Sequence, residues 1–167
     1  SSVNDRLSVV SVAGSAEAPE NELVFAYRLG FLLGSSGHVV ACGGGAGVME
    51  EVCRGAREAG GLTIGILPGT EASEGGRWLD IALPSGLGLG RNRVVALAGF
   101  CLVAVGGGNG TLSEIAHALQ SGRPVCCYGR WEGIPGVSRA GTPEEAYAFV
   151  EECERRAGCE APKTSKG

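Results

Sequence analysis

Short apolar runs alternate with helix-like segments along most of this chain. The apolar runs contain few polar residues, which is typical of strands whose two faces are both buried; they are residues 7–13, 38–42, 62–67, 79–83, 101–105 and 124–128. Between them, apolar positions recur every three or four residues, as on one face of a helix, over residues 19–33, 47–59, 89–99 and 111–120. Thr142-Pro143-Glu144-Glu145 has the pattern of a capping box and predicts the start of a last helix.

Strands that alternate with helices predict β-α-β units and a parallel sheet covered on both faces. We therefore expect a single three-layer α/β/α domain with a doubly wound parallel sheet over residues 1–159. Residues 160–167 are expected to form a disordered tail, because they are polar and terminal.

Composition and charge narrow the classes of function and partner that this chain can have. The chain of 167 residues is 44% hydrophobic and 19% charged, which indicates a globular protein. Its net charge of −4 argues against a nucleic-acid partner, since such binding rests on phosphate neutralisation by basic residues. No apolar stretch approaches the roughly 20 residues of a membrane-spanning helix, so we expect no membrane partner either.

The cysteines indicate structure rather than chemistry. There are 7, none in a C-x-x-C pair, so no metal site is expected. Several lie inside the apolar runs and are interpreted as reduced core residues of a cytoplasmic protein; these are Cys42, Cys101, Cys126 and Cys127.

Two glycine clusters directly follow predicted strands and precede predicted helices. A glycine turn that leads into a helix N-terminus offers free N–H groups to an anion such as phosphate. Because open α/β sheets bind ligands at the carboxyl ends of their strands, the two clusters predict one shared site; the alternative is that the glycines serve only tight turns. The candidate phosphate-binding residues are Gly43, Gly44, Gly45 and Gly47 in the first cluster and Gly107, Gly108, Asn109, Gly110 and Thr111 in the second.

Two common nucleotide motifs are excluded. A dinucleotide G-x-G-x-x-G fingerprint fails because Val48 and Thr111 stand where the third glycine belongs. A P-loop fails because the only lysines are Lys163 and Lys166.

Three charged residues are candidates for chemistry beside the glycine turns. Glu114 either closes a capping box with Thr111 or acts as a base or oxocarbenium stabiliser next to the phosphate. Arg91 and Arg93 follow the glycine-rich residues 85–90 and either bind phosphate in a bidentate manner or begin an ordinary surface helix.

The stretch Gly106-Gly107-Gly108-Asn109-Gly110-Thr111-x-x-Glu114 resembles the P-G-G-x-G-T-x-x-E motif of the LONELY GUY family, often labelled lysine-decarboxylase-like. Arg91, 15 positions before Gly106, matches the spacing of that family's catalytic arginine. The resemblance to the enzymatic branch implies a phosphoribohydrolase that cleaves the N-glycosidic bond of cytokinin riboside 5′-monophosphates or AMP, with Glu114 and Arg91 as catalytic residues.

A sister branch, the molybdenum cofactor carriers, is more similar still. Residues 60–69 resemble its G-G-x-T-I-G-x-L-P-G motif, and residues 80–91 resemble its D-I-x-x-x-x-G-L-G-x-x-R stretch. Gly106 in place of proline, and Asn92 in place of the enzymatic branch's lysine, favour this branch. The resemblance implies a Rossmann-like fold, a homo-oligomer (dimer or tetramer), the pyranopterin phosphate of the molybdenum cofactor as a bound ligand and no other required cofactor.

Three functions follow, in this order. The first is a carrier-like protein that binds a phosphorylated pterin or nucleotide, the second the phosphoribohydrolase, and the third a domain that senses a nucleotide without turnover. Lysine decarboxylation is excluded, since a pyridoxal enzyme needs an internal lysine and none precedes Lys163.

Overall fold

The computed structural model describes residues 6–159, and these form one parallel sheet of 7 strands in the order β4-β3-β2-β1-β5-β6-β7. Residues 1–5 and the predicted tail 160–167 lie outside the described residues. The strands are β1 (Val9–Gly14), β2 (Val39–Cys42), β3 (Thr63–Leu67), β4 (Ile81–Pro84), β5 (Leu102–Val105), β6 (Val125–Tyr128) and β7 (Val137–Arg139).

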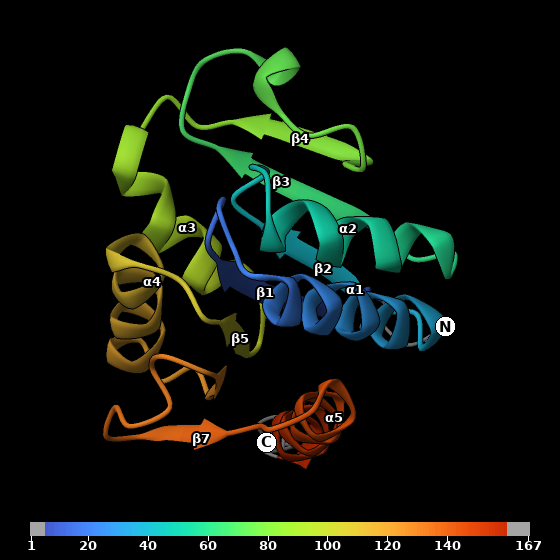
Figure 1. Ribbon diagram of the computed structural model, residues 1–167, viewed down its shortest axis with the longest axis vertical. Helices are drawn as coiled ribbons and strands as arrows, with labels where there is room; N and C mark the ends of the chain where they lie inside the picture. Colours follow the sequence, from blue (N-terminus) through green and yellow to red (C-terminus); the bar gives the residue numbers. More distant parts are fainter. Residues whose placement is uncertain (1–5, 160–167) are drawn as a thin grey trace, which may run out of the picture.

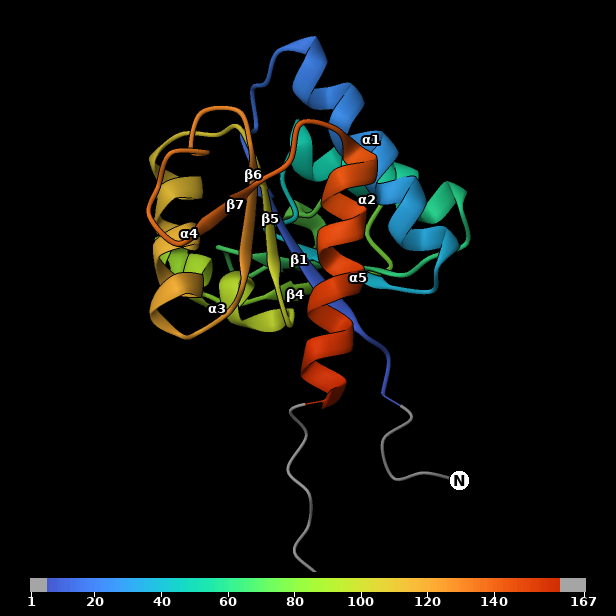
Figure 2. The same cartoon turned by 90° about the horizontal axis from the view of Figure 1, so that it is seen from below.

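Helices cover both faces of the sheet, as Figures 1 and 2 show. On one face lie α1 (Glu20–Ser35), α2 (Val48–Glu58) and α5 (Pro143–Cys159); on the other lie α3 (Arg91–Ala98) and α4 (Asn109–Gln120). Short 3₁₀ turns at Ala72–Glu74 and Gly88–Gly90 flank β4. The three-layer, doubly wound prediction is therefore confirmed. None of the helices within residues 6–159 combines the length and apolar character that crossing a membrane requires.

The central strands are buried on both sides, which explains why their sequences are apolar throughout rather than alternating. Val10, Val12, Val40 and Val103 have no exposed surface. The cysteines predicted to be core residues are buried, and burial raises the pKa of Cys126 and of Cys127 to about 12.

The ends of some elements differ from the sequence prediction. Strand β7 was not predicted: it is only three residues long and sits at the sheet edge, too short to show a hydrophobic pattern. Helix α4 begins at Asn109 with Gly108 as its N-cap, and no side chain caps it. Of the two interpretations of Glu114, the capping box with Thr111 is therefore wrong.

The capping prediction for the last helix is confirmed. The Glu145 N–H donates to Oγ1 of Thr142 at 3.1 Å. The Glu145 carboxylate in turn accepts the Gly141 N–H at 2.6 Å. The Thr142 side chain therefore fixes the start of α5 where the sequence pattern predicts it.

The strand order places a topological switch point between β1 and β5. Chain order runs outward from β1 through β2, β3 and β4 on one side, and from β5 through β6 and β7 on the other. The connections that leave the carboxyl ends of β1 and β5 therefore diverge and leave a crevice between them, which is where open α/β sheets bind ligands.

Candidate functional site

A cleft of about 350 Å³ opens at this switch point, a volume within the range of small-molecule sites. Three chain segments supply most of its lining: the β1–α1 connection, the turn that leads into α3, and the first turns of α4. Its residues are Gly14, Ser15, Ala16, Met49, Pro68, Gly88, Leu89, Arg91, Asn92, Gly108, Gly110, Thr111 and Glu114.

The second glycine turn delivers an open helix N-terminus to the cleft. The backbone φ of Gly107 is +95°, a conformation that favours glycine, and a Cβ there would lie 2.1 Å from Oγ1 of Thr111. The first-turn N–H groups of α4, from Asn109 to Thr111, have no acceptor within the helix. Gly108, Gly110 and Thr111 line the cleft, whereas Gly107 and Asn109 do not.

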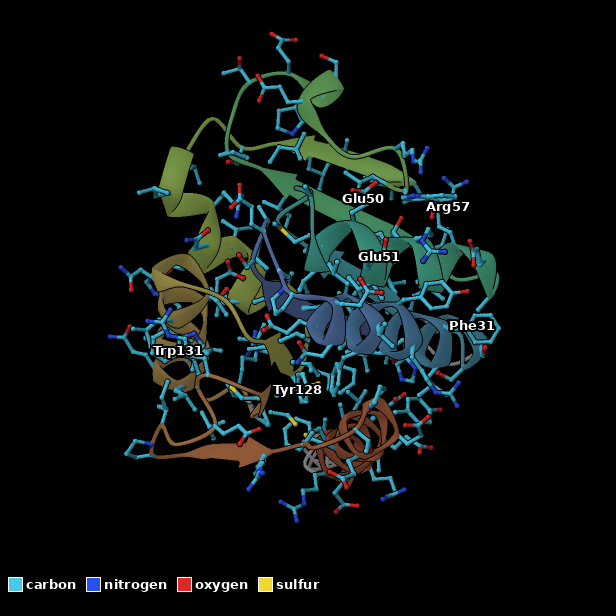
Figure 3. The ribbon with its side chains drawn as sticks, in the orientation of Figure 1. Phe31, Glu50, Glu51, Arg57, Tyr128 and Trp131 are labelled. Atoms are coloured by element: carbon cyan, nitrogen blue, oxygen red, sulfur yellow. The ribbon has the colours of Figure 1, made fainter. Side chains whose placement is uncertain are left out.

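The outer side of the same turn is held by an indole. Trp131, which lies beside α4 in Figure 3, donates its Nε1–H to the carbonyl of Gly107 at 3.2 Å. This hydrogen bond engages the carbonyl of Gly107, the residue two positions before α4 begins.

The first glycine turn supports the site rather than lining it. A Cβ on Gly43 would lie 2.5 Å from Nη1 of Arg91, so glycine makes room for this guanidinium. A Cβ on Gly47 would lie 2.3 Å from the carbonyl oxygen of Ser15, and the same oxygen accepts the Val48 N–H at 3.0 Å. Gly44 and Gly45 face Leu67 and Met49, and none of these four glycines lines the cleft.

The two candidate arginines separate in the structure. Arg91 lines the cleft as the first residue of α3, and its Nε is buried without a hydrogen-bond partner among the described residues. Arg93 is exposed and does not line the cleft. Its Nη1 lies 3.5 Å from Nδ1 of His117. An unpartnered guanidinium N–H in a cleft is suited to an anionic oxygen.

A short chain of hydrogen bonds joins Arg91 to α4. Nη1 of Arg91 donates to Oδ1 of Asn92 at 2.9 Å, and Nδ2 of Asn92 donates to Oγ of Ser113 at 3.0 Å. The Ser113 hydroxyl donates to the carbonyl of Gly110 at 2.7 Å. The side chain of Arg91 and the anion-binding end of α4 are therefore mechanically connected.

Glu114 contributes a carboxyl group to the lining of the cleft. It is only 7% exposed, and no hydrogen bond joins its carboxylate to any of the described residues. Burial raises its pKa to about 7, an effect that the neighbouring Arg91 partly offsets. A carboxyl group in this state can donate or accept a hydrogen bond near neutral pH, and a ligand would supply the partner it lacks.

Part of the lining was not foreseen from the sequence. Gly14 at the end of β1, Ser15 and Ala16 in the β1–α1 connection, and Met49 and Leu89 are additions. The signal that finds the connection is its position directly after the first strand, but its nearness to Gly108 depends on β1 pairing with β5.

A larger cavity of about 880 Å³ lies at the opposite edge of the sheet, around the residues that precede β5 and β6. Its arginines are already engaged: Arg123 donates to the carbonyls of Gly99 and Leu97, and Arg156 pairs with Glu152. The smaller cleft is the better candidate site because Nε of Arg91 and the carboxyl of Glu114 have no hydrogen-bond partner among the described residues.

A doubly wound sheet with a glycine turn and an open helix N-terminus at its switch point defines a Rossmann-like protein with a ligand cleft. The chain belongs to the SLOG cluster4 family, whose family model matches residues 7–156. It is 38% identical over 144 residues to an uncharacterised protein of Archaeoglobus fulgidus, covering 86% of this chain and 95% of that one.

Two solved structures are similar over nearly their whole length. The molybdenum cofactor binding protein of Rippkaea orientalis has 34% identity and a TM-score of 0.84, covering 89% of this chain and 98% of that one. The Moco carrier protein of Chlamydomonas reinhardtii has 36% identity and a TM-score of 0.82, covering 90% and 99%. The resemblance to the LONELY GUY superfamily, near the molybdenum cofactor carrier branch, is confirmed.

Proposed function

We propose that this protein binds a small phosphorylated ligand, a pterin or a nucleotide, in the cleft between β1 and β5, as a carrier of the molybdenum cofactor type. The observation that carries the proposal is the convergence of the open α4 N-terminus, the unpartnered Nε of Arg91 and the unpartnered carboxyl of Glu114 on one cleft. The similarity to proteins named as molybdenum cofactor binding and carrier proteins supports this choice of ligand class.

The phosphate group is assigned to the first turn of α4. There the N–H groups from Asn109 to Thr111 and the positive end of the helix dipole favour an anion. Arg91, which lines the same cleft, supplies the compensating positive charge. The first turn of α2 is less suited, because its Val48 N–H is already bonded and Glu50 and Glu51 add negative charge. Gly43, Gly44, Gly45 and Gly47 then act as supports for the site.

The remaining features of the proposal follow the family resemblance. We propose a homo-oligomer in the cytoplasm that requires no further cofactor and has neither a nucleic-acid nor a membrane partner. The net charge of −4 supports the absence of a nucleic-acid partner.

The second candidate is a phosphoribohydrolase for nucleoside 5′-monophosphates, and one observation favours it. A buried carboxyl with a pKa of about 7 beside an arginine, in a cleft that can hold a phosphate, is also what a ribosyl-transfer site needs. In that reaction Glu114 would meet the positive charge that develops at the ribose C1′.

Two measurements on the wild-type protein separate these functions. Native mass spectrometry of freshly purified protein is expected to show a retained phosphorylated ligand. Incubation with AMP is expected to release no adenine. Steady adenine release by the wild type, lost in both Glu114→Gln and Arg91→Ala, would establish the hydrolase and overturn the carrier. Loss in only one variant would still assign the hydrolysis to this protein, with that residue as the one it requires. Adenine release that both variants retain would point to a contaminating activity.

A further inference from the structure

Asn92 is a buried polar residue that follows Arg91 on α3 and lines the same cleft. It is 7% exposed and both ends of its side-chain amide are engaged, one with Nη1 of Arg91 and the other with Oγ of Ser113. Most buried polar side chains are satisfied by backbone groups or water. Here the amide instead joins two side chains from different helices.

The direction of these hydrogen bonds is fixed by chemistry. The guanidinium of Arg91 can only donate, so the Asn92 oxygen must face it. The Ser113 hydroxyl donates its hydrogen bond to the carbonyl of Gly110, so the Ser113 oxygen accepts a hydrogen bond from the Asn92 nitrogen. An amide is the side chain of this size that can accept at one end and donate at the other, which aspartate and leucine cannot do.

This arrangement restricts how Arg91 presents itself to a ligand. Nη1 is held by Asn92, and the backbone at Gly43 closes one side of the guanidinium. Nε remains buried and unpartnered. An arginine held in this way offers its Nε edge to two oxygens of one anion without first losing rotamer freedom.

We propose that Asn92 is a positioning residue, which orients Arg91 for the anionic group of the ligand and couples that orientation to the first turn of α4 through Ser113. This inference rests on the proposed function, in that Arg91 must bind the ligand's phosphate. Asn92 acts through Arg91, so its contribution to ligand binding disappears when Arg91 is absent.

A double-mutant cycle with ribose 5-phosphate as the probe tests this dependence. Isothermal calorimetry gives the Kd for wild type, Asn92→Ala, Arg91→Ala and the double variant. We expect Asn92→Ala to weaken binding about 10-fold, the scale of one hydrogen bond to a charged group. The double variant should bind no more weakly than Arg91→Ala alone. Asn21→Ala is the matched control, because its amide donates to the Tyr128 hydroxyl away from the cleft.

Each outcome of the cycle decides one point. Additive losses from Asn92→Ala and Arg91→Ala, or wild-type binding by Asn92→Ala, would overturn the positioning role while leaving the phosphate site intact. Wild-type binding by Arg91→Ala would overturn the proposed phosphate site itself, and the positioning role with it. Should Asn92→Ala fail to fold in thermal unfolding, Ser113→Ala takes its place in the cycle. It releases the Asn92 amide from α4, and the same non-additivity with Arg91→Ala is expected.

Discussion

The carboxyl of Glu114 links the stability of this protein to pH. Burial raises its pKa from an ordinary value of 4.5 to about 7, so between these values the folded protein binds more protons than the unfolded chain. The free energy of unfolding therefore falls as the pH rises through this window. Glu114→Gln removes the titration. Between about pH 5 and about pH 8 the wild type should lose on the order of 1–3 kcal/mol relative to Glu114→Gln in urea unfolding.

The groups around Glu114 provide a control for this prediction. Besides burial, the guanidinium of Arg91 shifts the pKa of Glu114, which it lowers. The Glu114 carboxylate acts on the nearby thiol of Cys42 on β2, but that thiol is not among the causes of the Glu114 shift. Cys42→Ala should therefore show the same fall in stability with rising pH as the wild type. Parallel pH profiles for the wild type and Glu114→Gln would show that the carboxyl is ionised in the folded protein throughout the window.

At the scale of elements, the start of α4 is where a side chain would block the ligand without disturbing the fold. A Cβ on Gly108 meets nothing within 4 Å, its φ of −103° is accessible to any residue, and it lines the cleft. Gly108→Val should keep the wild-type far-UV spectrum and weaken ribose 5-phosphate binding at least about 10-fold. Gly133→Val is the matched control, since its Cβ also meets nothing within 4 Å and it does not line the cleft. Equal binding by both variants would place the phosphate elsewhere.

The sequence predicts the buried strands well, because their burial leaves a clear apolar pattern. It predicts the first and last residues of the elements less well. The apolar runs identify β1, β2, β3, β5 and β6, because strands buried on both faces tolerate few polar side chains. The T-x-x-E pattern at Thr111 misled because α4 begins at Asn109, so Thr111 lies inside the first turn of the helix rather than at its N-cap. The pattern at Thr142 predicted correctly, since Glu145 there is exposed and free to turn back to the backbone.

At the scale of the whole molecule, the cleft depends on which strands pair with one another in the sheet, and no local sequence pattern encodes that pairing. Arg91, Glu114 and the second glycine turn were foreseen because each carries its own chemistry. These groups line one cleft together with Ser15 and Ala16 because β1 lies between β2 and β5 in the sheet. The first glycine turn was foreseen as a ligand contact, yet at Gly43 the structure uses the missing Cβ to admit Arg91. Whether the ligand reaches this turn stays a prediction.

The family resemblance predicts a homo-oligomer, and the surface beside the cleft suggests which residues join the copies. Large apolar side chains are exposed on β4 and on the segment that follows it: Ile81 at 45%, Leu83 at 49%, Leu87 at 57% and Leu89 at 87%. Large apolar side chains exposed close together in the sequence are a feature of association sites when they form one patch. We expect the wild type to sediment as a dimer or tetramer in analytical ultracentrifugation.

Leu89→Lys should shift the protein toward the monomer, because a charge buried at an interface loses hydration. Leu62→Lys, at a leucine 44% exposed outside this segment, should leave the assembly intact. A wild type that sediments as a monomer, or one that both substitutions dissociate equally, would contradict this assignment of the interface.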